Sequence, residues 1–210
     1  MEKTENNGRK KLVIQHYEVL QELGDCYTCA GKHDSAQDCY EQAALLAPEE
    51  ATPYIGLGVV ALQKELLDEA ESAFKIAISM DKRSPKAYTG LAMVLQRRGM
   101  YQQAFDTYLK SLEMDCDNLT ALLGLFQAAC FTGSFAKVTF YFEIYSGMHP
   151  DNTSVMFTLA ALYLKNGLPE KSKKLLQEIL ALDSSHSEAT KLLEEVRQQL
   201  SLESAAASQK

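Results

Sequence analysis

One internal repeat dominates this sequence: a pattern of apolar and small residues recurs five times at a spacing of about 34 residues. In residues 85–118 the apolar positions follow helical spacing before Gly99 and again after it. This predicts two short amphipathic helices joined by a glycine turn. The other copies keep the same phase, so that Leu91 is matched by Leu23, Leu57, Leu125 and Leu159. Helices this short cannot bury their apolar faces alone, so the repeat predicts a continuous core of stacked neighbours.

The individual positions carry a recognisable pattern. The first copy reads Leu23-Gly24-x-x-Tyr27, followed in phase by Gly31, Ala36, Tyr40, Ala43 and Pro48. With this spacing the chain resembles the tetratricopeptide repeat family over Tyr17 to His186. The resemblance implies an all-α, right-handed superhelical solenoid of helix–turn–helix repeats, in which the first helix of each repeat lines a concave groove. The family's usual large aromatic residue near the start of each repeat is missing or replaced, at Leu20, Tyr54, Tyr88, Leu122 and Met156.

The repeat phase also divides the chain. We predict a disordered N-terminus over residues 1–11, a single repeat domain over 12–200 and a flexible tail over 201–210. Inside the domain the repeats are expected at residues 17–50, 51–84, 85–118, 119–152 and 153–186. Residues 187–200 form one more amphipathic helix without a partner helix. Its polar outer side suits the cap that a solenoid requires at its end.

Charge and composition narrow the choice of partner. The formal net charge is −7, which disfavours nucleic acid and other polyanions as partners. No apolar run approaches the roughly 20 residues of a membrane span, and the polar start of the chain does not predict a signal peptide. The five cysteines follow no disulfide pattern, so they favour a reducing compartment and a cytoplasmic location.

The first repeat contains a Cys26-x-x-Cys29 motif, which raises the question of a metal or redox site. Structural zinc needs four ligands, usually from two such pairs, and the sequence has no second pair. Both cysteines lie inside a predicted helix, where no helix N-terminus stabilises a thiolate. We therefore expect Cys26, Cys29, Cys116 and Cys130 to be buried packing residues, and we expect neither a metal nor a cofactor.

Three glycines occupy one phase of the first helices: Gly56, Gly90 and Gly124. A glycine inside a helix costs roughly 1 kcal/mol relative to alanine, so a shared position suggests a shared cause. One interpretation is a groove wall without side chains, which a partner's backbone approaches closely. The alternative is tight packing against an adjacent helix.

The family phase assigns inward-facing positions along the expected groove. They form an acidic N-terminal end, a floor of small residues and an apolar C-terminal end. The groove residues are Glu18, Glu22, Asp25, Gly56, Lys86, Gly90, Met93, Arg97, Leu123, Gly124, Gln127, Phe131, Phe157 and Leu164. The hypothesis is a peptide or helix of a partner protein, with apolar anchors between Leu123 and Leu164 and basic residues toward Glu18 and Asp25.

The second helix of the fourth repeat departs from the pattern. Its Val138-Thr139-Phe140-Tyr141-Phe142 run favours a strand by propensity. We still predict a helix, because both flanks keep the repeat phase. Tyr141 and Tyr145 lie one turn apart, and we consider an exposed stripe that makes an outer contact, such as self-association, alongside the alternative of core packing.

No catalytic motif accompanies the repeats. The sequence has no phosphate-binding glycine loop, no HExxH and no serine elbow. We therefore expect a non-enzymatic scaffold, adaptor or chaperone that binds a segment of another protein. The alternative is a structural protein that assembles with copies of itself.

Overall fold

The computed structural model describes the backbone of residues 2–207 and the side chains of residues 14–202. This part of the chain forms helices and turns and contains no strand. The helices are α1 (Glu2–Cys29), α2 (His33–Leu46), α3 (Thr52–Gln63), α4 (Leu67–Met80), α5 (Pro85–Arg97), α6 (Tyr101–Met114), α7 (Leu119–Thr132), α8 (Phe135–Met148), α9 (Thr153–Lys165), α10 (Pro169–Leu182) and α11 (Ser187–Ala207). The all-α class of a helical-repeat protein is therefore confirmed.

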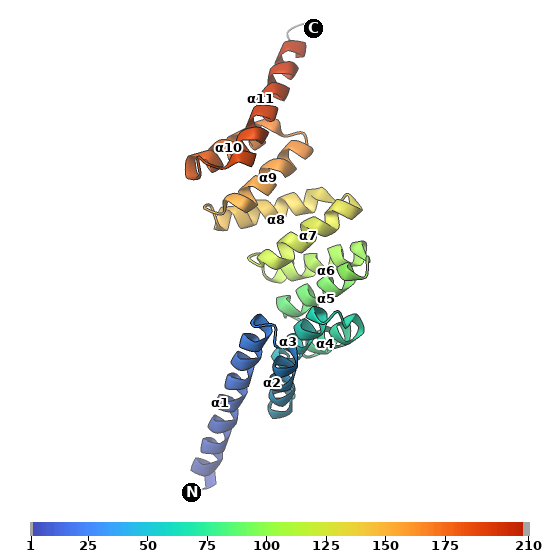
Figure 1. Cartoon of the computed structure of the whole chain (residues 1–210), viewed down its shortest axis with the longest axis vertical. Helices are drawn as coiled ribbons and strands as arrows, with labels where there is room; N and C mark the ends of the chain where they lie inside the picture. The colour runs from blue at the N-terminus through green and yellow to red at the C-terminus, as the bar shows by residue number, and fades with distance from the viewer. Residues whose placement is uncertain (1, 208–210) are drawn as a thin grey trace. The chain divides into compact units, whose positions relative to one another are not determined.

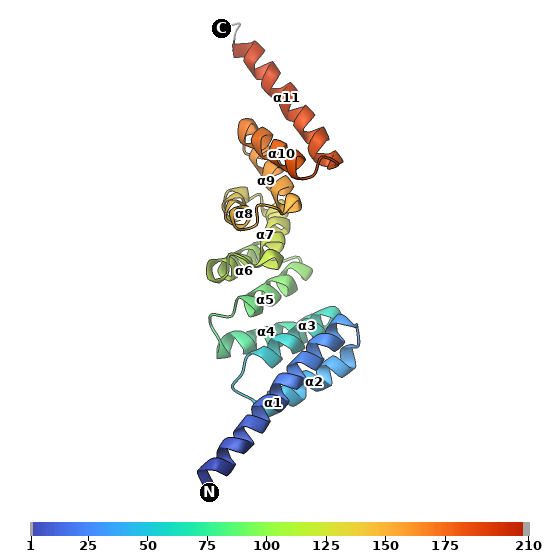
Figure 2. The same cartoon turned by 90° about the vertical axis from the view of Figure 1, so that its left-hand side faces the viewer.

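The chain divides into two compact units, unit 1 (Met1–Asp115) and unit 2 (Cys116–Lys210). The sequence predicted a single domain over residues 12–200, and each unit is described here by itself. Unit 1 contains α1 to α6, and unit 2 contains α7 to α11. Inside each unit consecutive helices pack side by side (Figure 1, Figure 2), and each predicted repeat contains one helix pair.

Both ends of the helical array extend further than the sequence indicated. Helix α1 starts at Glu2, within the segment that was expected to be disordered, and α11 continues to Ala207 instead of ending near residue 200. Residues 2–11 are rich in Glu, Lys and Arg, which favour a helix that the packed turns after them have already nucleated. Residues 208–210 of the expected tail lie outside the described residues.

The turn inside each repeat is a left-handed backbone position. Gly99 has φ 75°, and its N–H donates to the Gln96 carbonyl while the Met100 N–H donates to the Leu95 carbonyl. This closes the end of α5 as a glycine cap does. The second repeat makes the same turn with Glu65 at φ 60°, so it bears the steric cost that glycine avoids.

Helix α8 confirms the helical prediction for the second helix of the fourth repeat. Val138 and Phe142 are fully buried in it. The Phe142 ring meets Phe126 of α7 edge-on, with a centroid distance of 5.9 Å. Packing of this kind overrides the strand propensity of a bulky run.

An aromatic ring joins neighbouring repeats in unit 1. The Tyr40 ring of α2 lies between Gly24 of α1 and Gly56 of α3, and a Cβ atom added to either glycine would lie less than 3.0 Å from ring atoms. The Phe74 ring of α4 lies in the same way between Gly58 and Gly90. Both rings are buried, at 2% and 0% exposure.

This packing corrects one expectation. Gly56 and Gly90 are buried beneath rings of the preceding repeat and do not form an open groove wall. The absence of a side chain makes room for the ring, not for a partner's backbone. Gly124 of α7 is buried as well. The alternative interpretation, tight packing against an adjacent helix, is the one that the structure supports at Gly56 and Gly90.

The ring contact yields a stability prediction. Gly90→Ala places a methyl group against the buried Phe74 ring, so we expect it to destabilise the fold by about 1–3 kcal/mol, the usual cost of overpacking. Urea denaturation followed by circular dichroism measures the change.

The matched control is Gly147→Ala in α8, where nothing lies within 4 Å of the added Cβ. We expect this variant to be neutral or more stable by about 0.5–1 kcal/mol, because alanine is the better helix former. Equal stability of the two variants would contradict the packing account.

Candidate functional site

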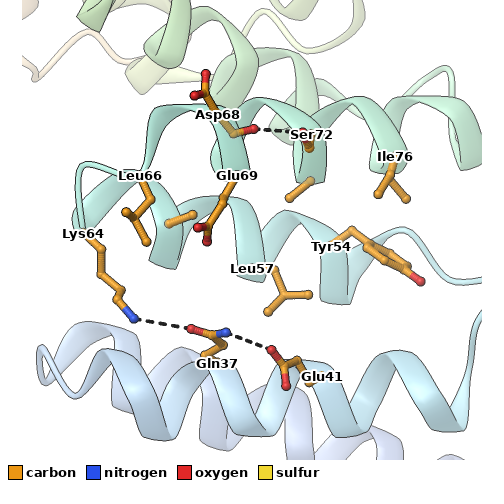
Figure 3. Close-up of a pocket in the computed structure, with 12 residues that line it drawn as sticks. Gln37, Glu41, Tyr54, Leu57, Lys64, Leu66, Asp68, Glu69, Ser72 and Ile76 are labelled. Carbon is orange, nitrogen blue, oxygen red and sulfur yellow. Dashed lines mark hydrogen bonds between the residues drawn. The ribbon is translucent and has the colours of Figure 1, made fainter.

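A pocket of about 460 Å³ opens on unit 1 between α2, α3 and α4 (Figure 3). Its interior is mainly apolar. The apolar lining residues are Tyr54, Leu57, Ala61, Leu66, Ala73 and Ile76. Figure 3 shows Leu57 and Glu69 directed into the space between the helices. A concave apolar site of this size suits one or two side chains of a bound segment.

The rim of this α2–α4 pocket is polar and mostly acidic. Lys64 Nζ donates to Asp34 Oδ1 at 3.1 Å, and Gln37 Nε2 donates to Glu41 Oε1 at 2.8 Å. Lys64 is therefore already paired on the rim. Glu69 and Glu41 remain exposed at the opening. The arrangement favours a neutral or basic group beside an apolar anchor.

The sequence did not single out this pocket, because most of its lining residues occupy ordinary repeat positions. One signal was present. Ile76 is 41% exposed and stands where the first and third repeats carry Gln42 and Lys110. An apolar residue at an otherwise polar, outward position could have indicated a contact surface.

The acidic residues predicted for the groove share one side of α1. Glu18, Glu22 and Asp25 are all exposed, and we call them the α1 acidic row. Asp25 has a second role, because its Oδ1 accepts a hydrogen bond from the Tyr40 hydroxyl at 2.6 Å. The row therefore lies beside the ring that joins the first two repeats.

The predicted groove residues of α5 differ in their surroundings. Lys86 is exposed, and Arg97 forms an ion pair with Glu65 of the preceding turn. Met93 is half-buried and packs against the cluster that contains Phe74 and Val94. Within unit 1, then, the exposed members of the predicted groove are charged, whereas its apolar member contributes to packing.

In unit 2 the predicted apolar anchors fall into two groups. Leu123, Gln127 and Phe131 recur at intervals of four on α7, and we call them the α7 row. Leu123 is 41% exposed and Phe131 66% exposed. Phe157 and Leu164 of α9 are instead half-buried against the core of α9, α10 and α11. The α7 row is therefore the more accessible part of the predicted anchor surface.

The outer aromatic stripe is corrected by the structure. Tyr145 is buried at 6% exposure and lies against the His149 ring at a centroid distance of 4.4 Å. Tyr141 is half-buried. The exposed ring of this helix is Phe140, at 56%, which meets Tyr141 edge-on. A tyrosine pair therefore does not form an exposed stripe, because Tyr145 stands at a repeat position that is also buried at Ala43, Ala77 and Ile179.

The expectation that Cys26, Cys29, Cys116 and Cys130 are buried packing residues is also corrected. Cys26, Cys29 and Cys130 are exposed and Cys116 is half-buried; Cys39 is buried. The first two lie in α1 as expected, but at exposed positions of this helix. Among the residues that the structure describes, no group of three or more His, Cys, Asp or Glu side chains could hold a metal ion.

The helix pairs, their turns and their packing now allow comparison with known proteins. The tetratricopeptide repeat family matches residues 30–85 and again residues 85–118. Residues 30–118 therefore consist of tetratricopeptide repeats. The structure of the chain is similar to PilF of Pseudomonas aeruginosa, with a TM-score of 0.72 at 17% identity over 93% of this chain and 89% of that chain.

Two further tetratricopeptide structures show the same fold. MamA superposes with a TM-score of 0.62 at 18% identity, over 83% of this chain and 95% of that one. YrrB, described as a TPR protein with an unusual peptide-binding site, superposes with a TM-score of 0.61 at 18% identity, over 83% of this chain and 90% of that chain. At these identities the likeness shows the fold alone.

The curated relatives are much longer than this chain. BBSome complex member BBS4 of Bos taurus is 32% identical over 117 residues, which is 56% of this chain and 22% of that protein. Tetratricopeptide repeat-containing protein trd-1 of Caenorhabditis elegans is 24% identical over 175 residues, 83% of this chain and 22% of that protein. The chain thus spans about a fifth of each relative. In the described residues, no helix has both the length and the apolar character to span a membrane.

Three tyrosines with raised pKa values lead to a prediction for the pH dependence of stability. Burial raises the pKa of Tyr40, Tyr108 and Tyr163, and hydrogen bonds to carboxylates add to this at Tyr40 and Tyr163. Unfolded tyrosines ionise near pH 10. Above that pH the unfolded chain loses protons that the folded chain keeps, so we expect stability to fall as pH rises. Thermal melts between pH 8 and pH 11.5 measure this loss.

Tyr40→Phe keeps the ring between its glycines and removes the ionising group. We expect its melting temperature to fall less steeply above pH 10 than that of the wild type. Tyr88→Phe, at a half-buried tyrosine of α5, serves as the control. An equally steep fall in Tyr40→Phe and the wild type would show that Tyr40 does not contribute.

Proposed function

We propose that this tetratricopeptide protein is a protein-binding scaffold that takes a peptide or helical segment of a partner. The observation that carries the proposal is the α7 row. Phe131 is 66% exposed and Leu123 is 41% exposed on one face of a helix whose other positions are largely buried. Large apolar side chains grouped in this way at a surface are typical of a contact site. An exposed aromatic anchor is the kind of residue that dominates binding energy.

The family supports the class of function. Tetratricopeptide proteins generally mediate protein–protein interactions, and the fold is typically a non-catalytic scaffold. The peptide-binding site named for YrrB supports a peptide as one form of partner. Adaptor and chaperone are the two roles that such binding would serve.

Unit 1 supplies a second docking surface in this proposal. The α2–α4 pocket and the α1 acidic row are both bordered by exposed carboxylates, among them Glu41, Glu69 and Glu22. Exposed charges mainly accelerate and orient an encounter. We therefore propose that partner segments bound by unit 1 carry basic residues next to an apolar anchor.

Self-assembly is the alternative function, and one of the surfaces considered for it is not exposed. The tyrosine stripe that suggested it is lost with the burial of Tyr145. A second copy bound at the α7 row would appear as concentration-dependent mass in light scattering, and a concentration-independent monomer would exclude it.

Five free cysteines support a reducing compartment, so we propose a cytoplasmic location.

Truncating the α7 row tests the proposal. Peptides are selected from a displayed library on the immobilised wild-type chain and then titrated in solution against Leu123→Ala/Phe131→Ala. Since a well-buried apolar side chain is worth about 1–3 kcal/mol, we expect the double variant to lose about tenfold or more in affinity, mainly through a faster off-rate.

Phe140→Ala is the matched control, because Phe140 is an aromatic residue of α8 with similar exposure, 56%. It should bind the selected peptides like the wild type. Circular dichroism confirms that both variants are folded. If the folded double variant binds every selected peptide unchanged, the α7 row is not the site.

A further inference from the structure

The first helices of the repeats share a stripe of residues that faces the preceding repeat. In α3 this stripe contains Pro53, Leu57 and Val60, of which Val60 is 1% exposed. In α5 the equivalent Val94 is 0% exposed. In unit 2, Leu193 and Val196 of α11 hold the same positions, and they are 5% and 0% exposed.

The second helix of the preceding repeat covers this stripe. Ala36 and Tyr40 of α2 pack on Val60, and Leu57 lies at the edge of the same cluster. Ala70 and Phe74 of α4 pack on Val94 in the same manner. Leu176 and Ile179 of α10 pack with Leu193 and Val196. The junctions share the residue at the Tyr40 position, which is Phe74 in α4 and Leu176 in α10. The second apolar residue is an alanine at one position in α2 and α4 and Ile179 at another position in α10.

Helix α1 carries the same stripe in an exposed state. Its equivalent residues are Val19, Leu23 and Cys26, and we call them the α1 stripe. Val19 is 52% exposed and Leu23 is 41% exposed, and Cys26 is exposed as well. Its neighbours in unit 1, α2 and α3, pack on a different side of the helix, through residues such as Leu20 and Gly24. The α1 stripe is therefore exposed at the positions that a helix covers in α3 and α5.

One position of α1 indicates the chemistry of the helix that would cover it. Gly56 and Gly90 receive the aromatic ring of the preceding second helix. The equivalent residue of α1 is Glu22, which is exposed, and Glu18 lies one turn before it. A ring does not fit against a glutamate side chain as it fits against glycine, whereas a lysine or arginine at the ring position would pair with the Glu22 carboxylate.

We propose that an amphipathic helix of a partner protein docks on the α1 stripe as α2 docks on α3. This helix has apolar residues over Val19 and Leu23 and a basic residue where α2 carries Tyr40. The surface is distinct from the α7 row, so failure of either proposal leaves the other standing.

Charge disfavours a second copy of the chain as the occupant. Two α1 helices packed antiparallel about a twofold axis would bring the acidic row of one against that of the other, because this packing places equivalent flanks together. End-to-end stacking on α11 is disfavoured as well. The side of α11 away from its buried stripe exposes Thr190, Glu194 and Arg197, which offer no apolar seat.

The chain itself supplies a probe. Helix α10 covers the stripe of α11 and carries three lysines and two glutamates. A synthetic peptide of residues 169–182 with Ser172→Ala and Leu176→Lys has an alanine where α2 carries Ala36 and its basic residue at the ring position. A lactam between Lys174 and Glu178, an exposed i,i+4 pair, keeps the peptide helical, since a helix this short is otherwise marginal in water. The comparison peptide has the same sequence with glutamate in place of lysine at position 176.

Both peptides are titrated by fluorescence anisotropy at low salt against the full chain and its variants. We expect the wild type to prefer the Lys peptide by about five-fold, and Glu22→Lys to prefer the Glu peptide by a similar factor. Leu23→Asp should lose about tenfold or more for both peptides. Leu45→Asp, at a leucine of α2 with 82% exposure, should bind like the wild type.

Several results would overturn the proposal. They are the absence of binding by either peptide, equal binding by Leu23→Asp and Leu45→Asp, and an unchanged peptide preference in Glu22→Lys. Sedimentation that shows a wild-type dimer abolished by Leu23→Asp would assign the stripe to a second copy, also against the proposal. Val19→Asp replaces Leu23→Asp if circular dichroism shows that the latter is unfolded.

Discussion

A contact between one aromatic ring and two glycines joins neighbouring repeats in unit 1. Tyr40 touches Gly24 in its own repeat and Gly56 in the next, so a single side chain fixes the distance inside a repeat and between repeats. Two helix-interior glycines cost roughly 2 kcal/mol together, and burial of the aromatic side chain between them, at about 1.5–3 kcal/mol, offsets this cost. The packing leaves no room for a side chain at either glycine. Exposed binding residues must therefore lie at other positions of the first helices.

Much of this fold follows from the sequence, because the repeat phase determines which residues are helical. It located the helix pairs, and it outweighed the strand propensity of Val138 to Phe142 in α8. Phase alone does not determine what covers a given face. Cys26 occupies a position that is buried in other repeats, yet it is exposed because the covering helix belongs to the preceding repeat. Tyr145, in contrast, follows the phase, since its equivalents Ala43, Ala77 and Ile179 are buried as well.

The candidate surfaces are the places where exposure departs from the repeat pattern. Phe131 and Leu123 expose apolar area on α7, Ile76 does so beside the α2–α4 pocket, and Val19 does so on α1. The acidic row and the α7 row were recognisable from composition and spacing. The pocket was not, because most of its lining residues occupy ordinary repeat positions and the space between them depends on how α2, α3 and α4 pack together. A helix-packing geometry of this kind is not encoded in any single position.

The ring and its second glycine are separated by sixteen residues in both junctions, Tyr40 to Gly56 and Phe74 to Gly90. The ring lies in the second helix of one repeat and this glycine in the first helix of the next, so each junction is shared by two successive repeats. Tandem duplication of a 34-residue stretch from this region, wherever its boundaries fell, would therefore reproduce a complete junction. A gene encoding such a chain can lengthen or shorten by whole repeats without inventing a new contact. Only the terminal repeats, whose outer faces lack a neighbour, need residues of their own.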